Sequence, residues 1–115
     1  MPTPDAAPAA AELDAIFGAL ADPVRRTLVE ELTAAPHGTP TSLAAGLPIT
    51  RQAVAKHLAA LAAAGIVSGT RTGREVRYEV TPEPLTAALR WITAVGADWD
   101  DRLARLASLI EERNR

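Results

Sequence analysis

The residues best suited to chemistry lie in the stretch TRQAVAKHLAALAAAG, residues 50–65. Val54, Leu58 and Leu61 recur at four- and three-residue spacing, which predicts the apolar face of a helix. The opposite face carries two cations, one amide, two small residues and no acid: Arg51, Gln52, Ala55, Lys56 and Ala59. Arg and Gln side chains match the donors and acceptors that guanine and adenine present in the major groove. The stretch therefore predicts a DNA-recognition helix.

Both ends of this helix are marked by residues that suit helix termini. Thr50 precedes the first turn, where its hydroxyl oxygen can accept a hydrogen bond from a backbone N–H that lacks a partner within the helix. Gly65 follows an alanine-rich run, and glycine adopts the left-handed conformation that ends many helices at little steric cost. We therefore expect the recognition helix to span residues 50–64.

The chain lacks the residues from which most catalytic and metal sites are built. It has no cysteine, only two histidines and no glycine-rich phosphate loop. These features exclude disulfides, thiolate metal sites and cysteine nucleophiles, and they leave no nucleophile paired with a base. Asp98, Asp100 and Asp101 fall on one helical turn, which is more typical of a solvated face than of a cation site. We predict no catalytic activity, no cofactor and no bound metal.

Length and charge favour one soluble domain that meets a polyanion on one face. A chain of 115 residues is long enough for one core and short for two. The net charge is -2, yet residues 50–80 hold five cations against two acids. A basic patch on an acidic body is typical of nucleic-acid-binding proteins. Because the sequence shows neither a signal-peptide pattern nor an apolar stretch of membrane-spanning length, we expect a cytoplasmic location.

Three helices should precede the recognition helix. Residues 1–9 are rich in Pro and Ala without a pattern, and we expect a disordered tail there. Helices are predicted over about residues 10–20, 22–34 and 40–46, the second opened by the capping pair Asp22-Pro23. A short helix, a tight turn and a second helix with a basic outer face together form a helix-turn-helix.

After Gly65 the hydrophobic pattern changes from helical to alternating. One strand opens at Ile66, a turn is expected at Thr72-Gly73, and apolar residues alternate along the return strand at Val76, Tyr78 and Val80. Residues 66–80 therefore predict a hairpin that follows the recognition helix as a wing. Wing residues expected to reach phosphates or the minor groove are Arg71, Arg74 and Arg77. Pairing of these arginines with Glu75 and Glu79 across the hairpin is the alternative.

The final helix, about residues 82–112, carries an apolar stripe that is too long for so small a core. Its spacing is close to a heptad repeat, which predicts pairing with another helix. A two-fold dimer interface is expected from two groups of residues, Leu13, Ile16, Phe17 and Leu20 of the first helix and Ile92, Val95, Trp99, Leu103, Leu106 and Ile110 of the last.

Several other residues have a structural interpretation that we favour over a functional one. His57 lies beside the apolar face of its helix, so we expect packing and a hydrogen bond rather than a DNA contact. Arg25 and Arg26 are expected to pair with Glu30 on the helix surface. The two tryptophans, Trp91 and Trp99, are expected to pack in the core or interface rather than to line an effector pocket.

In their order, the segments ADPVRRTLVEEL, TSLAAGLPITRQAVAKHLAALAAAGIV and TGREVRYEV, followed by a long helix, resemble the ArsR family of winged-helix repressors over roughly residues 11–110. The resemblance implies a homodimer on an inverted-repeat operator, with the DNA-contacting face at Thr50, Arg51, Gln52, Ala55 and Lys56. The Cys-x-Cys pair with which many members sense metals is absent from TSLAAGL, and the last helix has no histidine. Metal sensing is therefore not carried over.

The expected fold is mainly α with a small β-hairpin, a winged helix-turn-helix spanning residues 10–115. The leading hypothesis is a homodimeric transcriptional repressor that binds double-stranded operator DNA. The alternative is a winged-helix protein-interaction module without operator binding; the basic, acid-free face of residues 50–60 argues against it. A third hypothesis keeps DNA binding and adds a small-molecule effector, which the sequence does not identify, between the first and last helices.

Overall fold

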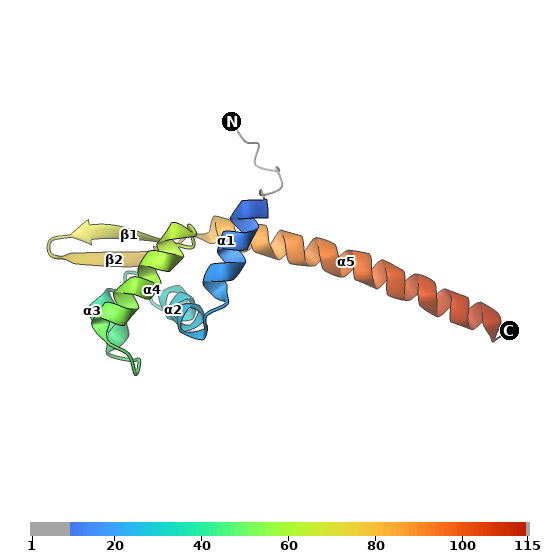
Figure 1. Cartoon of the computed structure of the whole chain (residues 1–115), viewed down its shortest axis with the longest axis horizontal. Helices are drawn as coiled ribbons and strands as arrows, with labels where there is room; N and C mark the ends of the chain where they lie inside the picture. The colour runs from blue at the N-terminus through green and yellow to red at the C-terminus, as the bar shows by residue number, and fades with distance from the viewer. Residues whose placement is uncertain (1–9, 115) are drawn as a thin grey trace, which may run out of the picture.

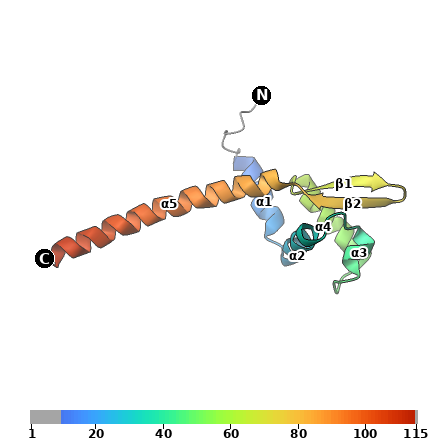
Figure 2. The ribbon, with the colours of Figure 1, turned by 180° about the vertical axis from the view of Figure 1, so that it is seen from behind.

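The computed structural model describes residues 10–114 and shows a small helical body from which one long helix extends (Figure 1). The tail expected at residues 1–9 lies outside the described residues. The elements, in chain order, are α1 (Ala10–Leu20), α2 (Pro23–Ala34), α3 (Pro40–Ala44), α4 (Arg51–Ala63), β1 (Val67–Thr72), β2 (Glu75–Val80) and α5 (Pro82–Arg113). The expected class, mainly α with one hairpin, is confirmed. Seen from either side, the hairpin and α3 lie at the end of the molecule opposite to the tip of α5 (Figures 1 and 2).

Side-chain caps set the starts of three helices. The Asp22 carboxylate accepts hydrogen bonds from the backbone N of Val24 at 2.8 Å and of Arg25 at 3.1 Å, and Pro23 occupies the first helical position, as predicted. A reciprocal capping box of Thr39 and Ser42 opens α3. The Thr50 hydroxyl accepts from the backbone N of Ala53 at 3.1 Å and opens α4. Thr81 precedes α5, but its side chain makes no such bond, and Pro82 occupies the first helical position there.

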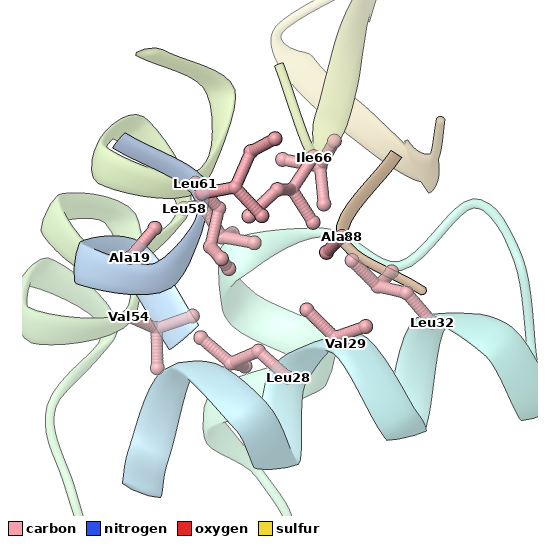
Figure 3. Close-up of a cluster of buried hydrophobic side chains, with 11 residues drawn as sticks. Ala19, Leu28, Val29, Leu32, Val54, Leu58, Leu61, Ile66 and Ala88 are labelled. Atoms are coloured by element: carbon pink, nitrogen blue, oxygen red, sulfur yellow. The ribbon is translucent and has the colours of Figure 1, made fainter. Parts of the chain in front are cut away.

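The core lies where α2 and α4 meet the base of the hairpin (Figure 3). The predicted apolar row of α4, Val54, Leu58 and Leu61, is fully buried. Large side chains packed with it come from α2 and from the residue that precedes β1: Leu28, Leu32 and Ile66. Because every side chain in this row points inward, the opposite face of α4 is turned to solvent.

The hairpin is antiparallel and pairs Thr72 with Glu75. Its two-residue turn is therefore Gly73-Arg74, one residue later than predicted, and Gly73 has a φ of 66°. A positive φ at the first of two turn residues suits a tight hairpin and favours glycine there. The apolar residues of β2 are half-buried and alternate with exposed residues, as expected.

The base of the wing is tied to the loop between α2 and α3. The backbone N of His37 donates to the Tyr78 carbonyl at 3.0 Å, and the backbone N of Tyr78 donates to the Gly38 carbonyl at 2.9 Å. A Cβ at Gly38 would lie 2.9 Å from Cδ2 of Leu32, so any larger residue in this loop would force that buried side chain to shift. The wing is thereby fixed relative to the helices.

The long helix α5 packs on the body only through its first turns. Ala88 is buried, and the ring of Trp91 meets Phe17 of α1 edge to face, with the centroids 5.5 Å apart. Ile16 is only 4% exposed. Its side chain thus belongs to the core of its own chain, and this corrects its expected place at the dimer surface. None of the helices in residues 10–114 combines the length and apolarity that crossing a membrane requires.

Candidate nucleic-acid interface

The outer face of α4 gathers most of the residues predicted to contact DNA. Arg51, Gln52 and Lys56 are exposed, and Ala55 between them is half-buried. No acid lies on α4, whose sequence is RQAVAKHLAALAA. The helix thus presents donors of hydrogen bonds and positive charge on one side while its other side anchors it in the core. This is the arrangement that a helix needs to enter a major groove flanked by phosphates.

Arg51 is held in place by the preceding helix. Its Nε donates to Oγ1 of Thr41 in α3 at 3.0 Å, and both side chains are exposed. The terminal nitrogens of the guanidinium remain available to a base edge or a phosphate. The short helix of the helix-turn-helix therefore orients a side chain of the recognition helix, a role for Thr41 that the sequence pattern did not reveal.

The start of α4 is suited to an anion. The Oγ1 atom of Thr50 accepts the cap hydrogen bond, so its own O–H is left to donate. The first-turn N–H groups of a helix and the positive end of its dipole also attract phosphate. Thr50 therefore suits a backbone contact better than a base contact.

His57 and the two arginines of α2 have structural partners. Nε of Arg25 donates to Nδ1 of the half-buried His57 at 3.4 Å, which supports the interpretation of His57 as a packed, hydrogen-bonded residue. Arg26 donates to the carbonyls of Leu20 at 2.7 Å and Ala21 at 3.0 Å, and so caps the end of α1. Pairing of these arginines with Glu30 was predicted wrongly, because tertiary contacts offered them other partners.

The capping contacts around Asp22 also affect its charge. A hydrogen bond from the backbone N of Arg25 is the largest cause that lowers the pKa of the Asp22 carboxyl below its ordinary value, and the nearby His57 and Arg25 side chains act in the same direction. The carboxylate therefore stays ionised beside the α2–α4 contact.

The three wing arginines do not share a face. Residues paired across a hairpin point to the same side, so Arg71 shares a side with Val76, whereas Arg77 shares a side with Thr70. Arg77 also has acids two residues away on both sides, at Glu75 and Glu79. Arg74 lies in the turn and is exposed. The hairpin therefore offers Arg74 at its tip and Arg71 on one side, and it separates Arg77 from them.

A short helix, a turn, a second helix with an exposed basic face and a hairpin held beside it define the class of winged helix-turn-helix proteins. A family model described as a helix-turn-helix domain matches residues 20–70. An HTH-type transcriptional regulator of Mycobacterium tuberculosis is 38% identical, and the match covers 85% of this chain and 88% of that protein.

Solved structures narrow this class to a family. An ArsR-like transcriptional regulator from Rhodococcus sp. RHA1 is 42% identical with a TM-score of 0.73, over 86% of this chain and 92% of that one. The homodimeric winged helix-turn-helix DNA-binding domain of a Mycobacterium bovis protein shares the fold at 18% identity, with a TM-score of 0.61 over 76% of this chain and 81% of that one. The chain belongs to the ArsR family of transcriptional regulators.

Proposed function

We propose that the protein is a homodimeric repressor that binds an inverted-repeat operator through α4 and the wing. The observation that carries this proposal is the exposed, acid-free face of α4 above a fully buried apolar row. In this arrangement Gln52 and Arg51 meet base edges, Lys56 and Thr50 meet phosphates, and the Arg74 tip of the wing meets the backbone beside the groove.

The dimer half of the proposal is supported by α5. All of the large apolar residues that are strongly exposed in residues 10–114 belong to this helix: Leu89, Trp91, Ile92, Trp99, Leu103, Leu106, Leu109 and Ile110. A contiguous apolar patch of this kind marks an interaction surface. Because it lies on α5 and not on α4, protein pairing and DNA contact use separate faces, which favours a DNA-binding dimer over an interaction module without DNA binding. The homodimeric state of the Mycobacterium bovis domain is consistent with this assignment.

The test is binding of the protein to its own upstream DNA and to a scrambled duplex, by fluorescence anisotropy at two salt concentrations. We expect tight binding to the upstream sequence alone, with a steep loss of affinity as salt rises. Equal, weak binding to both duplexes would favour the interaction module.

Two substitutions separate base contacts from phosphate contacts. Gln52→Ala should relax discrimination at one base pair in each half-site, by about 1–3 kcal/mol. Arg74→Ala should weaken binding to all sequences alike and reduce the salt slope by about 1. Arg105→Ala, which removes the same charge from the exposed side of α5, is the matched control and should change neither quantity. Identical losses on operator and random DNA for both test variants would contradict this division of roles.

A further inference from the structure

Helix α5 carries a continuous apolar line with heptad spacing, which we name the α5 seam. Its members follow one another at steps of four and three residues: Leu85, Leu89, Ile92, Gly96, Trp99, Leu103, Leu106 and Ile110. Alternation of four and three gives seven residues for every two turns, the repeat of helices that pair in a left-handed coiled coil. The apolar side chains from Leu89 onward are each more than half exposed, between 52% and 62%.

The body of the chain covers only the start of this seam, where Leu85 is half-buried against the core, and leaves the seam open from Leu89 onward. Where α5 lies on the body, Ala88 is only 5% exposed, yet the neighbouring Leu89 is 62% and Ile92 is 52% exposed. Helix α1 therefore packs against an adjacent side of α5, through Phe17 and Trp91, and leaves the seam open. Beyond these turns α5 extends away from every other element (Figures 1 and 2). The partner of the seam must have the same repeat, and α5 of a second copy does.

Resting on the proposed homodimer, we propose that two α5 helices pair antiparallel in one register, with Gly96 of each copy facing Trp99 of the other. The remaining layers follow from this one by counting along the two helices. Ile92 then faces Leu103, Leu89 faces Leu106, and Leu85 faces Ile110. Every member of the seam has an apolar partner, and the smallest residue receives the largest.

Packing density selects this register over its neighbours. Close-packed interfaces tolerate neither voids nor overfilled layers. A shift by one heptad would set Trp99 against Leu89 or Leu103 and leave Gly96 opposite a branched aliphatic residue too short to fill the space. A parallel pair would place Gly96 opposite Gly96 and Trp99 opposite Trp99, which combines a void with a clash. Only the proposed register balances the volumes of the layers along the whole seam.

The residues beside the seam are compatible with this register. In an antiparallel pair the proposed layers bring Thr93 beside Asp100 of the second copy, where a hydroxyl can donate to a carboxylate. On the other side Val95 comes beside Arg102, whose guanidinium already lies 5.5 Å from the centre of the Trp99 ring of its own chain. No two like charges are brought opposite each other at these flanking positions.

The register matters to the proposed function because it fixes the distance between the two DNA-binding bodies. A slip of one heptad moves one copy by about 10 Å along the helix axis. That displacement corresponds to about three base pairs of DNA. The Gly96–Trp99 layer therefore selects the spacing of half-sites that the dimer accepts.

Cysteine crosslinking tests the register directly, because the chain contains no cysteine. In the variant carrying Ile92→Cys and Leu103→Cys, mild oxidation should give a covalent dimer, since these positions face each other between copies. Within one chain the two positions are about 16 Å apart along the helix, beyond the reach of a disulfide. Each single variant is the control, because its two cysteines are separated by the same distance in the antiparallel pair.

Two further pairs report the shifted registers. The variants Ile92→Cys with Ile110→Cys, and Leu85→Cys with Leu103→Cys, should give little covalent dimer. If either crosslinks in preference to the first pair, the proposed register is wrong, whereas the homodimer itself stands. If the unmodified protein sediments as a monomer, both the register and the proposed dimer fail, and operator binding is then judged separately by anisotropy.

Exchange of the two central residues provides a second measurement. Gly96→Trp alone should weaken dimerisation by about tenfold or more, because it sets two large rings against each other. The double variant with Gly96→Trp and Trp99→Gly restores one glycine and one tryptophan to each central layer. Recovery of the wild-type dimer dissociation constant to within a few-fold is expected. A double variant that dimerises as poorly as the single one would overturn the assignment.

Discussion

Replacing Leu103 with alanine should weaken the dimer far more than it weakens the folded chain. Leu103 is 58% exposed in the single chain, so that share of its surface is available for burial by a second copy. Full burial of a leucine is worth about 1.5–3 kcal/mol, so the available share is worth about 1–1.7 kcal/mol for each copy. A dimer contains two such sites, and the loss of about 2–3.5 kcal/mol raises the dimer dissociation constant roughly 30- to 300-fold.

Sedimentation equilibrium over a range of protein concentrations measures this constant, and circular dichroism of the same samples reports the helix content. Alanine preserves helix propensity, so the helix content of the fully associated protein should be unchanged. Ser108→Ala, in the same part of α5 but off the seam, is the matched control and should leave the constant as it is. A dissociation constant for Leu103→Ala within threefold of the wild type would refute the assignment of this face to the dimer.

Three further outcomes are expected. Gly38→Ala should lower the free energy of unfolding by about 1–3 kcal/mol, as measured by urea denaturation, because the added Cβ would lie 2.9 Å from Leu32 Cδ2. Leu58→Ala should cost about 2–5 kcal/mol in the same assay, because the removed atoms leave a cavity in the core. The lowered pKa of Asp22 means that its ionised form adds stability above the ordinary pKa of 3.8, and this is lost as the pH falls through the folded-state pKa. Asp22→Asn should therefore be less sensitive to acid than the wild type when unfolding is followed from neutral to acid pH.

Local patterns in the sequence predicted most of the fold. The start of α2 follows from Asp22-Pro23, and the limits of α4 follow from Thr50 and from Gly65, which has a φ of 77°. The alternation along β2 was also visible, because each of these features depends on backbone sterics or on hydrogen bonds between near neighbours. The outer face of α4 could be predicted for the same reason, since one buried row fixes which side of a helix faces solvent.

Features that depend on tertiary contacts could not be predicted in the same way. The helical repeat places Ile16 and Phe17 on one stripe, but only the packing of α1 against the body decides that Ile16 is buried. Arg26 donates hydrogen bonds to backbone carbonyls at the end of α1, whereas the sequence pattern predicted that it would pair with Glu30 on its own helix. The separation of Arg77 from the other wing arginines depends on strand pairing, and the one-residue displacement of the turn determines that pairing.

A few buried side chains connect the proposed DNA-binding face, formed by α4 and the wing, with α5, which carries the proposed dimer seam. Ala88 of α5 lies in the same buried cluster as Leu58 of α4 and Ile66 at the base of the wing (Figure 3). Because protein cores are close-packed, a displacement of α5 at Ala88 disturbs the same cluster that supports the inner side of α4. Under the proposed pairing, a different operator spacing requires either a new register along the seam or a rearranged core, and not a small adjustment at the recognition helix.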